Sequence, residues 1–213
     1  MIFERLGRVE YADGLQRQAK LVEARRAGEI PDTVLLLEHP PVITLGVKTR
    51  QGPNHIIASP GELAREGVAV HETGRGGDVT YHGPGQLVAY PILDLRPDRC
   101  DVHRYVRDLE EVLIRALADF GIEGARVQEL SGVWVGPAGR ERKIAAIGVR
   151  ISRWITSHGF ALNVSTDLRH FRLIVPCGIA DRGVTSIQQE LGRDVSMEDV
   201  MSSVEHAFKS VFS

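Results

Sequence analysis

Two neighbouring segments constrain the fold of this chain more than any other feature. Residues 144–151 and 155–164 both alternate apolar with polar or small side chains, a pattern typical of β-strands. Only Ser152-Arg153-Trp154 separates them, and so short a connection predicts an antiparallel hairpin. Further segments with strand-like composition are residues 33–37, 42–45, 68–71, 87–93 and 133–135.

Three other segments are predicted to be amphipathic helices. Residues 103–120 place apolar side chains at helical spacing, and Gly121 follows as a stop signal. A second helix starts at Ser196 and carries apolar residues on one face, and a third covers about residues 11–27. Hairpins mixed with packed helices predict the α+β fold class.

Length and composition predict one globular domain over residues 1–213. The chain is 43% hydrophobic and 25% charged, without internal repeats or a linker rich in Pro, Gly or Ser. Its formal net charge of −2 argues against a general nucleic-acid binder. It has no apolar N-terminal region and no apolar run long enough for a membrane span. We therefore expect a cytoplasmic protein that binds neither nucleic acid nor membrane.

The two cysteines lie in different contexts. Neither has the spacing of a metal site or a C-x-x-C motif, so we expect a reducing cytosol and no metal. Cys100 lies between two aspartates, whose negative charge opposes thiolate formation. Cys177 follows an apolar segment and precedes Gly178, which makes it the better candidate nucleophile. The alternative is an inert buried thiol that serves only packing.

A reactive thiol needs a nearby cation, because positive charge favours the thiolate over the thiol. Lys143 is the candidate, since it precedes the apolar residues Ile144 to Ile147, which can hold an ammonium in a poorly hydrated site. A desolvated lysine can also act as a general base. The alternative is an ordinary surface cation within the basic group Arg140, Arg142, Arg150 and Arg153.

Residues 75–86 form the segment with the greatest density of glycine and polar side chains. Its sequence is Arg-Gly-Gly-Asp-Val-Thr-Tyr-His-Gly-Pro-Gly-Gln. Glycine allows positive φ and a close approach of the backbone to a ligand, so the segment predicts a ligand-binding loop, with a long hairpin connection as the alternative. Other catalytic templates are missing, and His39, His82 and His158 are interpreted as hydrogen-bonded structural histidines.

Five ordered sequence blocks resemble the lipoyl(octanoyl) transferase family. They are Glu38-His39-Pro40-Pro41, residues 75–86, residues 143–148, residues 158–163, and Pro176-Cys177-Gly178-Ile179 followed by Gly183-Val184-Thr185-Ser186. The resemblance covers about residues 35–190. It implies the fold of biotin and lipoate protein ligases, in which a mixed, largely antiparallel sheet is flanked by helices.

The resemblance also implies a reaction. An octanoyl group moves from the thioester of octanoyl-acyl carrier protein to Cys177, and then to a lysine of a lipoyl-accepting domain, with Lys143 as the activating partner and no cofactor. The implied acceptors are the lipoyl domains of 2-oxoacid dehydrogenase complexes and the glycine cleavage H protein. The implied substrate-binding residues are Arg75, Gly76, Gly77, Asp78, Val79, Thr80, Tyr81, His82, Ala146, Ile147, Gly148, Gly159, Phe160 and Ala161. Backbone N–H groups near Gly77 and Gly178 are candidate oxyanion donors.

Three other functions compete with this interpretation. An ATP-dependent lipoate or biotin-type protein ligase would use the glycine loop to hold an acyl-adenylate and would need no cysteine. A non-catalytic acyl-binding module would leave Cys177 dispensable. A thiol hydrolase would use His82 or His158 as a base and water as the acceptor.

Overall fold

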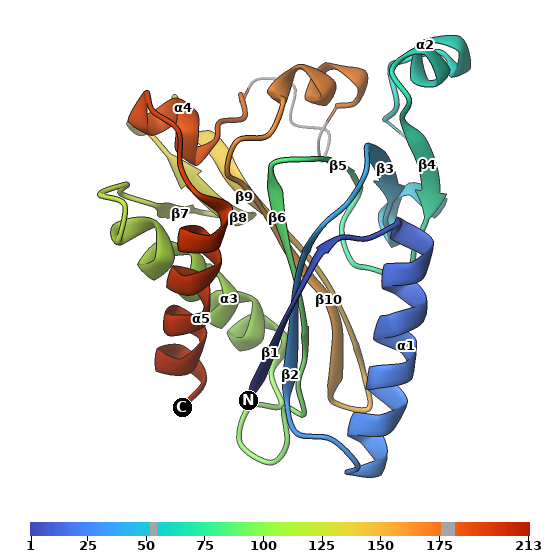
Figure 1. Ribbon diagram of the computed structural model, residues 1–213, viewed down its shortest axis with the longest axis vertical. Helices are drawn as coiled ribbons and strands as arrows, with labels where there is room; N and C mark the ends of the chain where they lie inside the picture. The colour runs from blue at the N-terminus through green and yellow to red at the C-terminus, as the bar shows by residue number, and fades with distance from the viewer. Residues whose placement is uncertain (52–54, 176–181) are drawn as a thin grey trace.

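The computed structural model describes residues 1–51, 55–175 and 182–213. Within these residues the strands form two sheets (Figure 1). In spatial order the large sheet consists of β1 (Ile2–Arg8), β2 (Thr33–Glu38), β6 (Gln86–Ile92), β10 (Ile155–Asn163), β9 (Arg142–Ser152), β8 (Leu130–Val135) and β7 (Ala125–Val127). The small sheet consists of β4 (Ala69–Glu72), β3 (Val42–Leu45) and β5 (Val79–His82). Each sheet has one parallel pair, β1 with β2 and β3 with β4, and its other neighbours are antiparallel.

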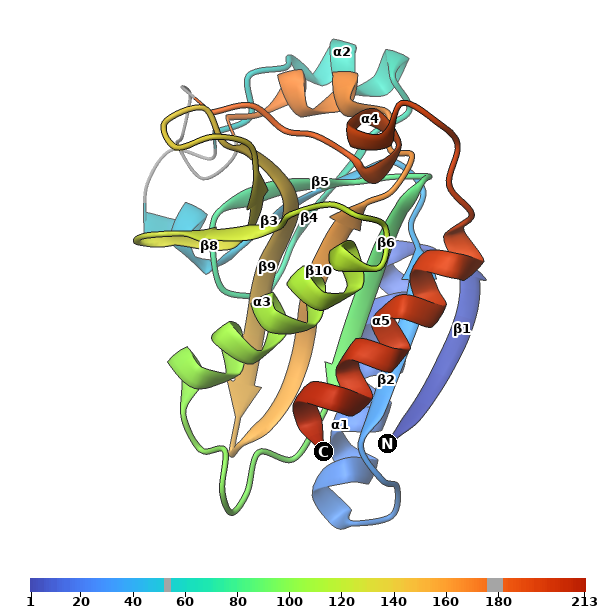
Figure 2. The ribbon, with the colours of Figure 1, turned by 90° about the vertical axis from the view of Figure 1, so that its left-hand side faces the viewer.

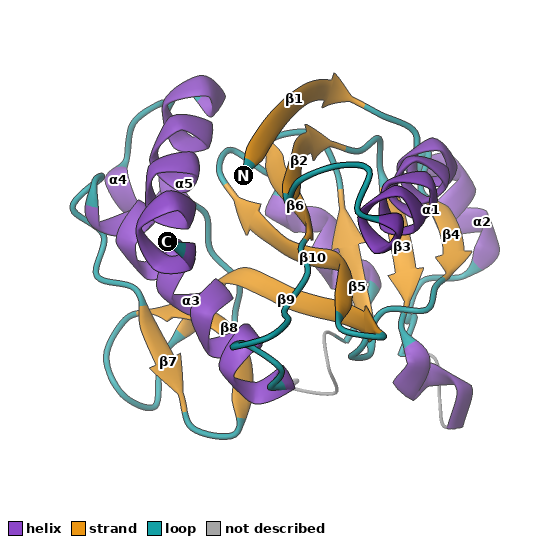
Figure 3. Cartoon of the chain, turned by 90° about the horizontal axis from the view of Figure 1, so that it is seen from below, coloured by secondary structure: helices purple, strands orange, loops and turns teal. Residues whose placement is uncertain are grey.

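Helices cover both faces of the large sheet (Figures 2 and 3). The three long ones are α1 (Tyr11–Ala27), α3 (Val102–Ala118) and α5 (Met197–Phe212). Shorter helical segments are η1 (Val47–Gln51), α2 (Pro60–Arg65), η2 (Leu168–Leu173) and α4 (Ile187–Leu191). The observed fold is the predicted α+β class, a largely antiparallel sheet flanked by helices.

Alternating side chains on β2 show how the large sheet is held between its helices. Val34 and Leu36 belong to the core cluster beneath α3 and α5, whereas Leu35 and Leu37 belong to the cluster on the α1 side. All four side chains are fully buried. Each contributes about 1.5–3 kcal/mol of hydrophobic stabilisation, so both layers depend on this strand.

The predicted hairpin is confirmed in β9 and β10, whose pairing begins with Ser152 opposite Ile155. Arg153 and Trp154 form its two-residue turn with φ of 52° and 66°. Positive φ at both central positions matches the right-handed twist of paired strands, as in a type I′ turn. The turn therefore fixes the register of the two central strands.

The N-terminal strand and part of the glycine-rich segment differ from the sequence prediction. Residues 2–8 belong to none of the segments predicted from sequence, and they form β1, which pairs with β2 at the sheet edge. Residues 79–82 were expected to belong to a loop, but they form β5 against β3, because Val, Thr and Tyr favour extended backbone. In the described part of the chain, no helix is long and apolar enough to cross a bilayer.

Candidate active site

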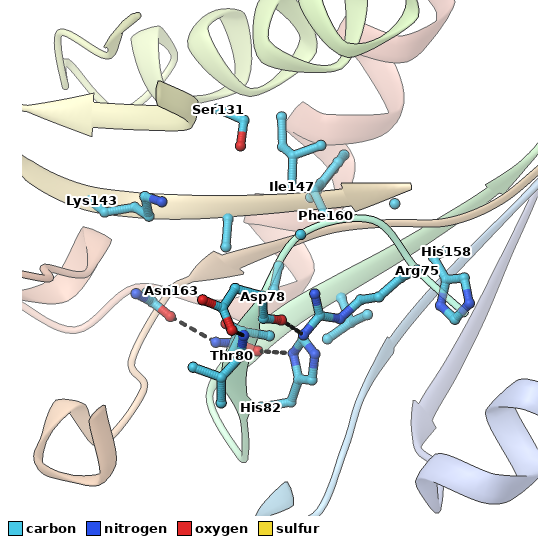
Figure 4. Close-up of a pocket in the computed structure, with 18 of the residues that line it drawn as sticks. Arg75, Asp78, Thr80, His82, Ser131, Lys143, Ile147, His158, Phe160 and Asn163 are labelled. Carbon is cyan, nitrogen blue, oxygen red and sulfur yellow. Dashed lines mark hydrogen bonds between the residues drawn. The ribbon is translucent and has the colours of Figure 1, made fainter. Parts of the chain in front are cut away.

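A cavity of about 230 Å³ lies between the small sheet and strands β6, β9 and β10 (Figure 4). Lys143 lines it, together with most of the predicted substrate-binding residues: Arg75, Gly77, Asp78, Val79, Thr80, His82, Ala146, Ile147, Gly148, Gly159, Phe160 and Ala161. Residues from distant parts of the sequence therefore converge on one space. That convergence is what a substrate pocket requires.

Two of the predicted residues lie outside the cavity lining. Tyr81 points into a separate core cluster and stacks on His170 with ring centroids 5.0 Å apart. It occupies the opposite face of β5 from its neighbours Thr80 and His82, as strand alternation requires. The N–H of Gly76 donates to the carbonyl of Val149 at 2.8 Å, which ties the glycine-rich segment to β9.

Arg75 organises the polar part of the cavity. Its guanidinium is buried and donates to the carbonyl and hydroxyl oxygens of Thr44 at 2.7 and 2.9 Å, and to the carbonyl of Asp78 at 2.7 Å. These bonds cross from the glycine-rich segment to β3 and close the segment back on itself. Arg75 therefore fixes the shape of the loop as well as lining the pocket.

The carboxylate of Asp78 is also held in place. One oxygen accepts a hydrogen bond from the backbone N–H of Val79 at 2.7 Å, and the other contacts His55 Nδ1 at 2.6 Å. A carboxylate with two such partners has little freedom to rotate. Asp78 therefore presents a fixed negative group to the cavity.

His82 belongs to a chain of side-chain hydrogen bonds (Figure 4). Its Nδ1 donates to Gln86 Oε1 at 2.7 Å, Gln86 Nε2 donates to Asn163 Oδ1 at 2.9 Å, and Asn163 Nδ2 donates to the carbonyl of Thr185 at 2.9 Å. Burial lowers the pKa of His82 to about 3, so its ring is neutral at pH 7. The chain links the cavity to Thr185, which lies beyond the candidate nucleophile in sequence.

The other two histidines singled out by sequence are buried beside Tyr90. Tyr90 donates its hydroxyl to Nε2 of His39 at 2.7 Å, and Nδ1 of His39 donates to the carbonyl of Val9 at 2.6 Å, which confirms the structural interpretation of His39. His158 packs edge-on to Tyr90, and burial lowers the pKa of His158 to about 4. This end of the cavity is therefore polar but carries no imidazolium charge at neutral pH.

Two facing glycines shape the cavity wall. Gly148 and Gly159 pair directly across β9 and β10. A Cβ on Gly148 would lie 2.9 Å from the carbonyl oxygen of Gly76, and one on Gly159 would lie 2.2 Å from that of Ala89. The missing side chains thus make room for the protein's own backbone, which brings the glycine-rich segment close to β9.

A β-bulge turns Lys143 toward the cavity. Val133 faces Ala145 across β8 and β9, but Trp134 faces Lys143, so Ile144 is an extra residue in β9. Strict alternation would place Lys143 on the face of Ala145, which belongs to the large core. The inserted residue shifts the register by one and brings Lys143 to the side of Ala146.

Cys177 and Gly178 lie outside the described residues, but the chain on both sides of them forms hydrogen bonds near the cavity. Before them, the N–H of Val175 donates to the carbonyl of His55 at 2.8 Å. After them, Gly183 accepts a hydrogen bond from the N–H of Lys143 at 2.9 Å, and Thr185 donates to the carbonyl of Lys143 at 3.0 Å. The chain six positions beyond Cys177 is therefore bonded to the backbone of Lys143.

Cys100 is exposed and lies near the opposite end of β9. Its loop follows Leu95, whose N–H donates to the carbonyl of Trp154 in the β9–β10 turn at 2.9 Å. At about 3.3 Å per residue, β9 separates that turn from Lys143 by roughly 30 Å. The basic residues near Lys143 in sequence are also far apart in space. Arg142 pairs with Glu190 near the cavity, whereas Arg153 lies in the distant β9–β10 turn.

Several residues of the lining were not among the implied substrate-binding residues. They are Tyr11, Lys48, Gln86, Val88, Tyr90, Glu129, Leu130, Ser131, His158, Asn163, Phe171 and Val184. The alternation of β6 carried a signal for three of them, because Gln86, Val88 and Tyr90 share one face of that strand. The other positions depend on how distant segments pack together.

Comparison with known proteins agrees with this geometry. Residues 10–209 match the family model described as the lipoyl protein ligase A/B catalytic domain. The chain is 55% identical over 210 residues to an octanoyltransferase of Myxococcus xanthus, with 98% of this chain and 58% of that protein covered. It is 56% identical to an octanoyltransferase of Acidobacterium capsulatum, with 97% and 88% covered.

Two solved structures share the fold at low sequence identity. One is a bi-partite lipoate protein ligase from Thermoplasma acidophilum, with a TM-score of 0.72, 18% identity, and coverage of 100% of this chain and 84% of that one. The other is a biotin protein ligase from Aquifex aeolicus in complex with biotin and ATP, with a TM-score of 0.60, 16% identity, and coverage of 98% and 69%.

Proposed function

Because the chain belongs to the lipoyl protein ligase A/B catalytic-domain family, we propose that it is an octanoyltransferase. It moves an octanoyl group from acyl carrier protein, through a thioester on Cys177, to a lysine of a lipoyl-accepting domain. Lipoyl domains of 2-oxoacid dehydrogenase complexes and the glycine cleavage H protein are the acceptors. The catalytic unit is a single domain over residues 1–213.

The observation that carries the proposal is the position of Lys143. It lines a cavity with an apolar part, and its backbone is bonded on both sides to the chain just beyond Cys177. Gly183, which is bonded to Lys143, follows Cys177 by six residues. Six residues of extended chain span at most about 20 Å. This connection supports a shared role for Lys143 and Cys177 at the pocket that Lys143 lines.

The first half-reaction transfers the acyl group to the enzyme. The Cys177 thiolate, favoured by the Lys143 ammonium, attacks the thioester carbonyl, and the tetrahedral intermediate expels the carrier thiolate. The carrier thiolate takes a proton from the Lys143 ammonium and leaves as the thiol, so Lys143 becomes neutral. The product is octanoyl-Cys177. Exchange of one thioester for another is nearly neutral in free energy, so no ATP is needed.

The second half-reaction forms an amide. Lys143 in its neutral form removes a proton from the acceptor lysine ammonium, and the resulting amine attacks the octanoyl thioester. The carbon–nitrogen bond forms as the bond to Cys177 breaks, the nitrogen releases its second proton to solvent, and the Cys177 thiolate and Lys143 ammonium are regenerated. Conversion of a thioester to an amide is downhill, which drives the overall transfer.

The cavity suits an acyl chain. Val79, Val88, Ala146, Phe160 and Ala161 supply apolar surface, and the neutral rings of His82 and His158 place no imidazolium charge beside it. At about 0.8 kcal/mol per buried CH₂, the methylenes of an octanoyl chain contribute on the order of 5 kcal/mol of binding free energy. Acyl-chain length is therefore expected to affect binding strongly.

Intact-mass analysis tests the proposal. After mixing with octanoyl-acyl carrier protein, the wild-type enzyme and Cys100→Ser should each gain one octanoyl group, and Cys177→Ser should gain none. Addition of a lipoyl domain without ATP should move the group to the acceptor. Transfer by an enzyme that never carries the adduct contradicts the covalent route, and a requirement for ATP and free octanoate favours the ligase alternative.

A further inference from the structure

Trp134 forms a platform beneath the Lys143 ammonium. The indole is 2% exposed, and Lys143 Nζ lies over it, 4.6 Å from the ring centroid. That distance is well within the range of about 6 Å over which the negative face of an aromatic ring attracts a cation. Tryptophan gives the strongest such attraction among the aromatic side chains.

The pairing of the two strands produces this contact. Trp134 lies directly opposite Lys143 in the antiparallel pair β8–β9, and directly opposed residues project from the same face of a sheet. Without the extra residue Ile144, the register would place Lys143 opposite Val135 and turn it away from the indole. The bulge that directs Lys143 into the cavity is therefore also the feature that seats it on Trp134.

The same ring contacts the chain beyond Cys177. The guanidinium carbon of Arg182 lies 5.7 Å from the centroid of Trp134, and Arg182 Nη1 contacts Glu141 Oε2 at 2.6 Å. Arg182 stands five positions after Cys177 in sequence. Trp134 thus touches both Lys143 and the first described residue after the segment that contains the nucleophile.

We propose that Trp134 is a positioning residue, whose ring holds the Lys143 ammonium at the cavity and anchors Arg182 beside it. The indole itself need not touch the substrate. It limits where the ammonium can lie and favours its charged form, which is the form that stabilises a thiolate. The functional part of this inference rests on the proposed role of Lys143, whereas the contact itself can be tested without any activity.

Nuclear magnetic resonance of the full chain tests the contact directly. The sequence contains four lysines, Lys20, Lys48, Lys143 and Lys209, so a protein labelled at lysine Cε gives few signals, and Lys143→Arg identifies the one of interest. Protons above an indole face are shifted upfield, so the Lys143 ε-methylene signal should be shifted in the wild type. The signal should keep part of that shift in Trp134→Phe and lose it in Trp134→Leu. In Trp134→Leu the Lys143 signal should also titrate at lower pH than in the wild type.

Phe3→Leu is the matched control. Lys209 Nζ lies 5.4 Å from the centroid of Phe3, a similar contact on the α5 side of the large sheet. This variant should change the Lys209 signal while the Lys143 signal and the rate of octanoyl transfer stay unchanged. Trp134→Leu, in contrast, should slow transfer between about 2- and 30-fold, which corresponds to the loss of one cation–π contact of about 0.5–2 kcal/mol.

The possible outcomes separate the two proposals. An unshifted Lys143 signal in the wild type overturns the role of Trp134, even if Trp134→Leu does not fold. The role of Trp134 is also overturned if Trp134→Leu leaves the chemical shift and the titration of the Lys143 signal unchanged, whatever its activity. A normal ring shift combined with full activity of Lys143→Ala leaves the contact intact but removes the proposed function of Lys143.

Discussion

The carboxylate of Glu110 on α3 accepts a hydrogen bond from the backbone N–H of Gly132 on β8, with Oε1 and N 3.1 Å apart. Glu110 is fully buried and also pairs with Arg107 and Arg126. Gly132 cannot carry a side chain, because its Cβ would lie 2.4 Å from the carbonyl oxygen of Ala145. A buried charge on a helix therefore braces the strand that also carries Ser131 and Trp134.

Glu110→Leu should destabilise the protein by about 1–3 kcal/mol, because it leaves the buried N–H of Gly132 unsatisfied, while the partly exposed Arg107 and Arg126 remain in contact with water. Glu110→Gln, which keeps an acceptor for that N–H, should cost less. Urea denaturation measures both. Glu111→Gln on the same helix is the control and should cost at most about 1 kcal/mol, because its pairs with Arg115 and Arg126 are partly exposed. Equal losses in all three variants would contradict a specific bracing role.

Substitution of Lys143 should affect the thiolate and the proton transfer differently. Lys143→Ala should shift the alkylation profile of Cys177 to higher pH and slow transfer at least about 100-fold, since both the cation and the base are lost. Lys143→Arg keeps the charge but cannot release a proton at neutral pH, so alkylation should stay fast while transfer remains slow. Iodoacetamide kinetics from pH 5 to 10, together with acceptor modification, measure the two effects. An unchanged alkylation profile in Lys143→Ala would refute the dyad.

The buried His82 should make stability depend on pH. Its pKa in the folded protein is lowered to about 3, whereas an unfolded histidine has a pKa of about 6.5, so the unfolded chain binds the extra proton first. The stabilisation from this group is fully present above about pH 6.5 and is lost as the pH falls toward 3. We expect the free energy of unfolding to drop by a few kcal/mol over that interval.

His82→Asn isolates this contribution, because an asparagine amide can still donate to Gln86 Oε1 but does not titrate. The loss of stability between pH 6.5 and 4 should be smaller in this variant, as measured by urea denaturation at several pH values. His206→Asn, at an exposed position on α5, serves as the control. An identical pH dependence in the wild type and His82→Asn would show that His82 does not resist protonation.

Gly148→Ala should weaken substrate binding by displacing the glycine-rich segment. The new Cβ would lie 2.9 Å from the carbonyl oxygen of Gly76 and 3.2 Å from Cδ of Arg75, so the segment must move away from β9. Overpacking of this kind costs about 1–3 kcal/mol, and KM for octanoyl-acyl carrier protein should rise. Gly61→Ala on α2 is the control, since its Cβ meets only Arg65 Nη1 at 3.7 Å. An unchanged KM in Gly148→Ala would contradict the tight packing of Arg75 against β9.

Local patterns in the sequence were sufficient for most of the secondary structure. The apolar spacing of residues 103–120 and the short connection at residues 152–154 predicted α3 and the β9–β10 hairpin, because helical and strand periodicity and turn length act over a few residues. The resemblance likewise predicted about half of the residues that line the cavity.

Only the tertiary structure decided how those residues are used. No local signal reveals that Ile144 is an extra residue opposite β8, yet this bulge sets Lys143 on Trp134 and beside the cavity. In the same way, Tyr81 lies in the glycine-rich segment but faces another core, and His82 is neutral because the surrounding protein excludes water from it. Sequence alone determined the long helices, most of the strands and the reactive residue types, because these depend on near neighbours. Register, burial and charge state depend on segments far apart in the chain, so they followed only from the packed fold.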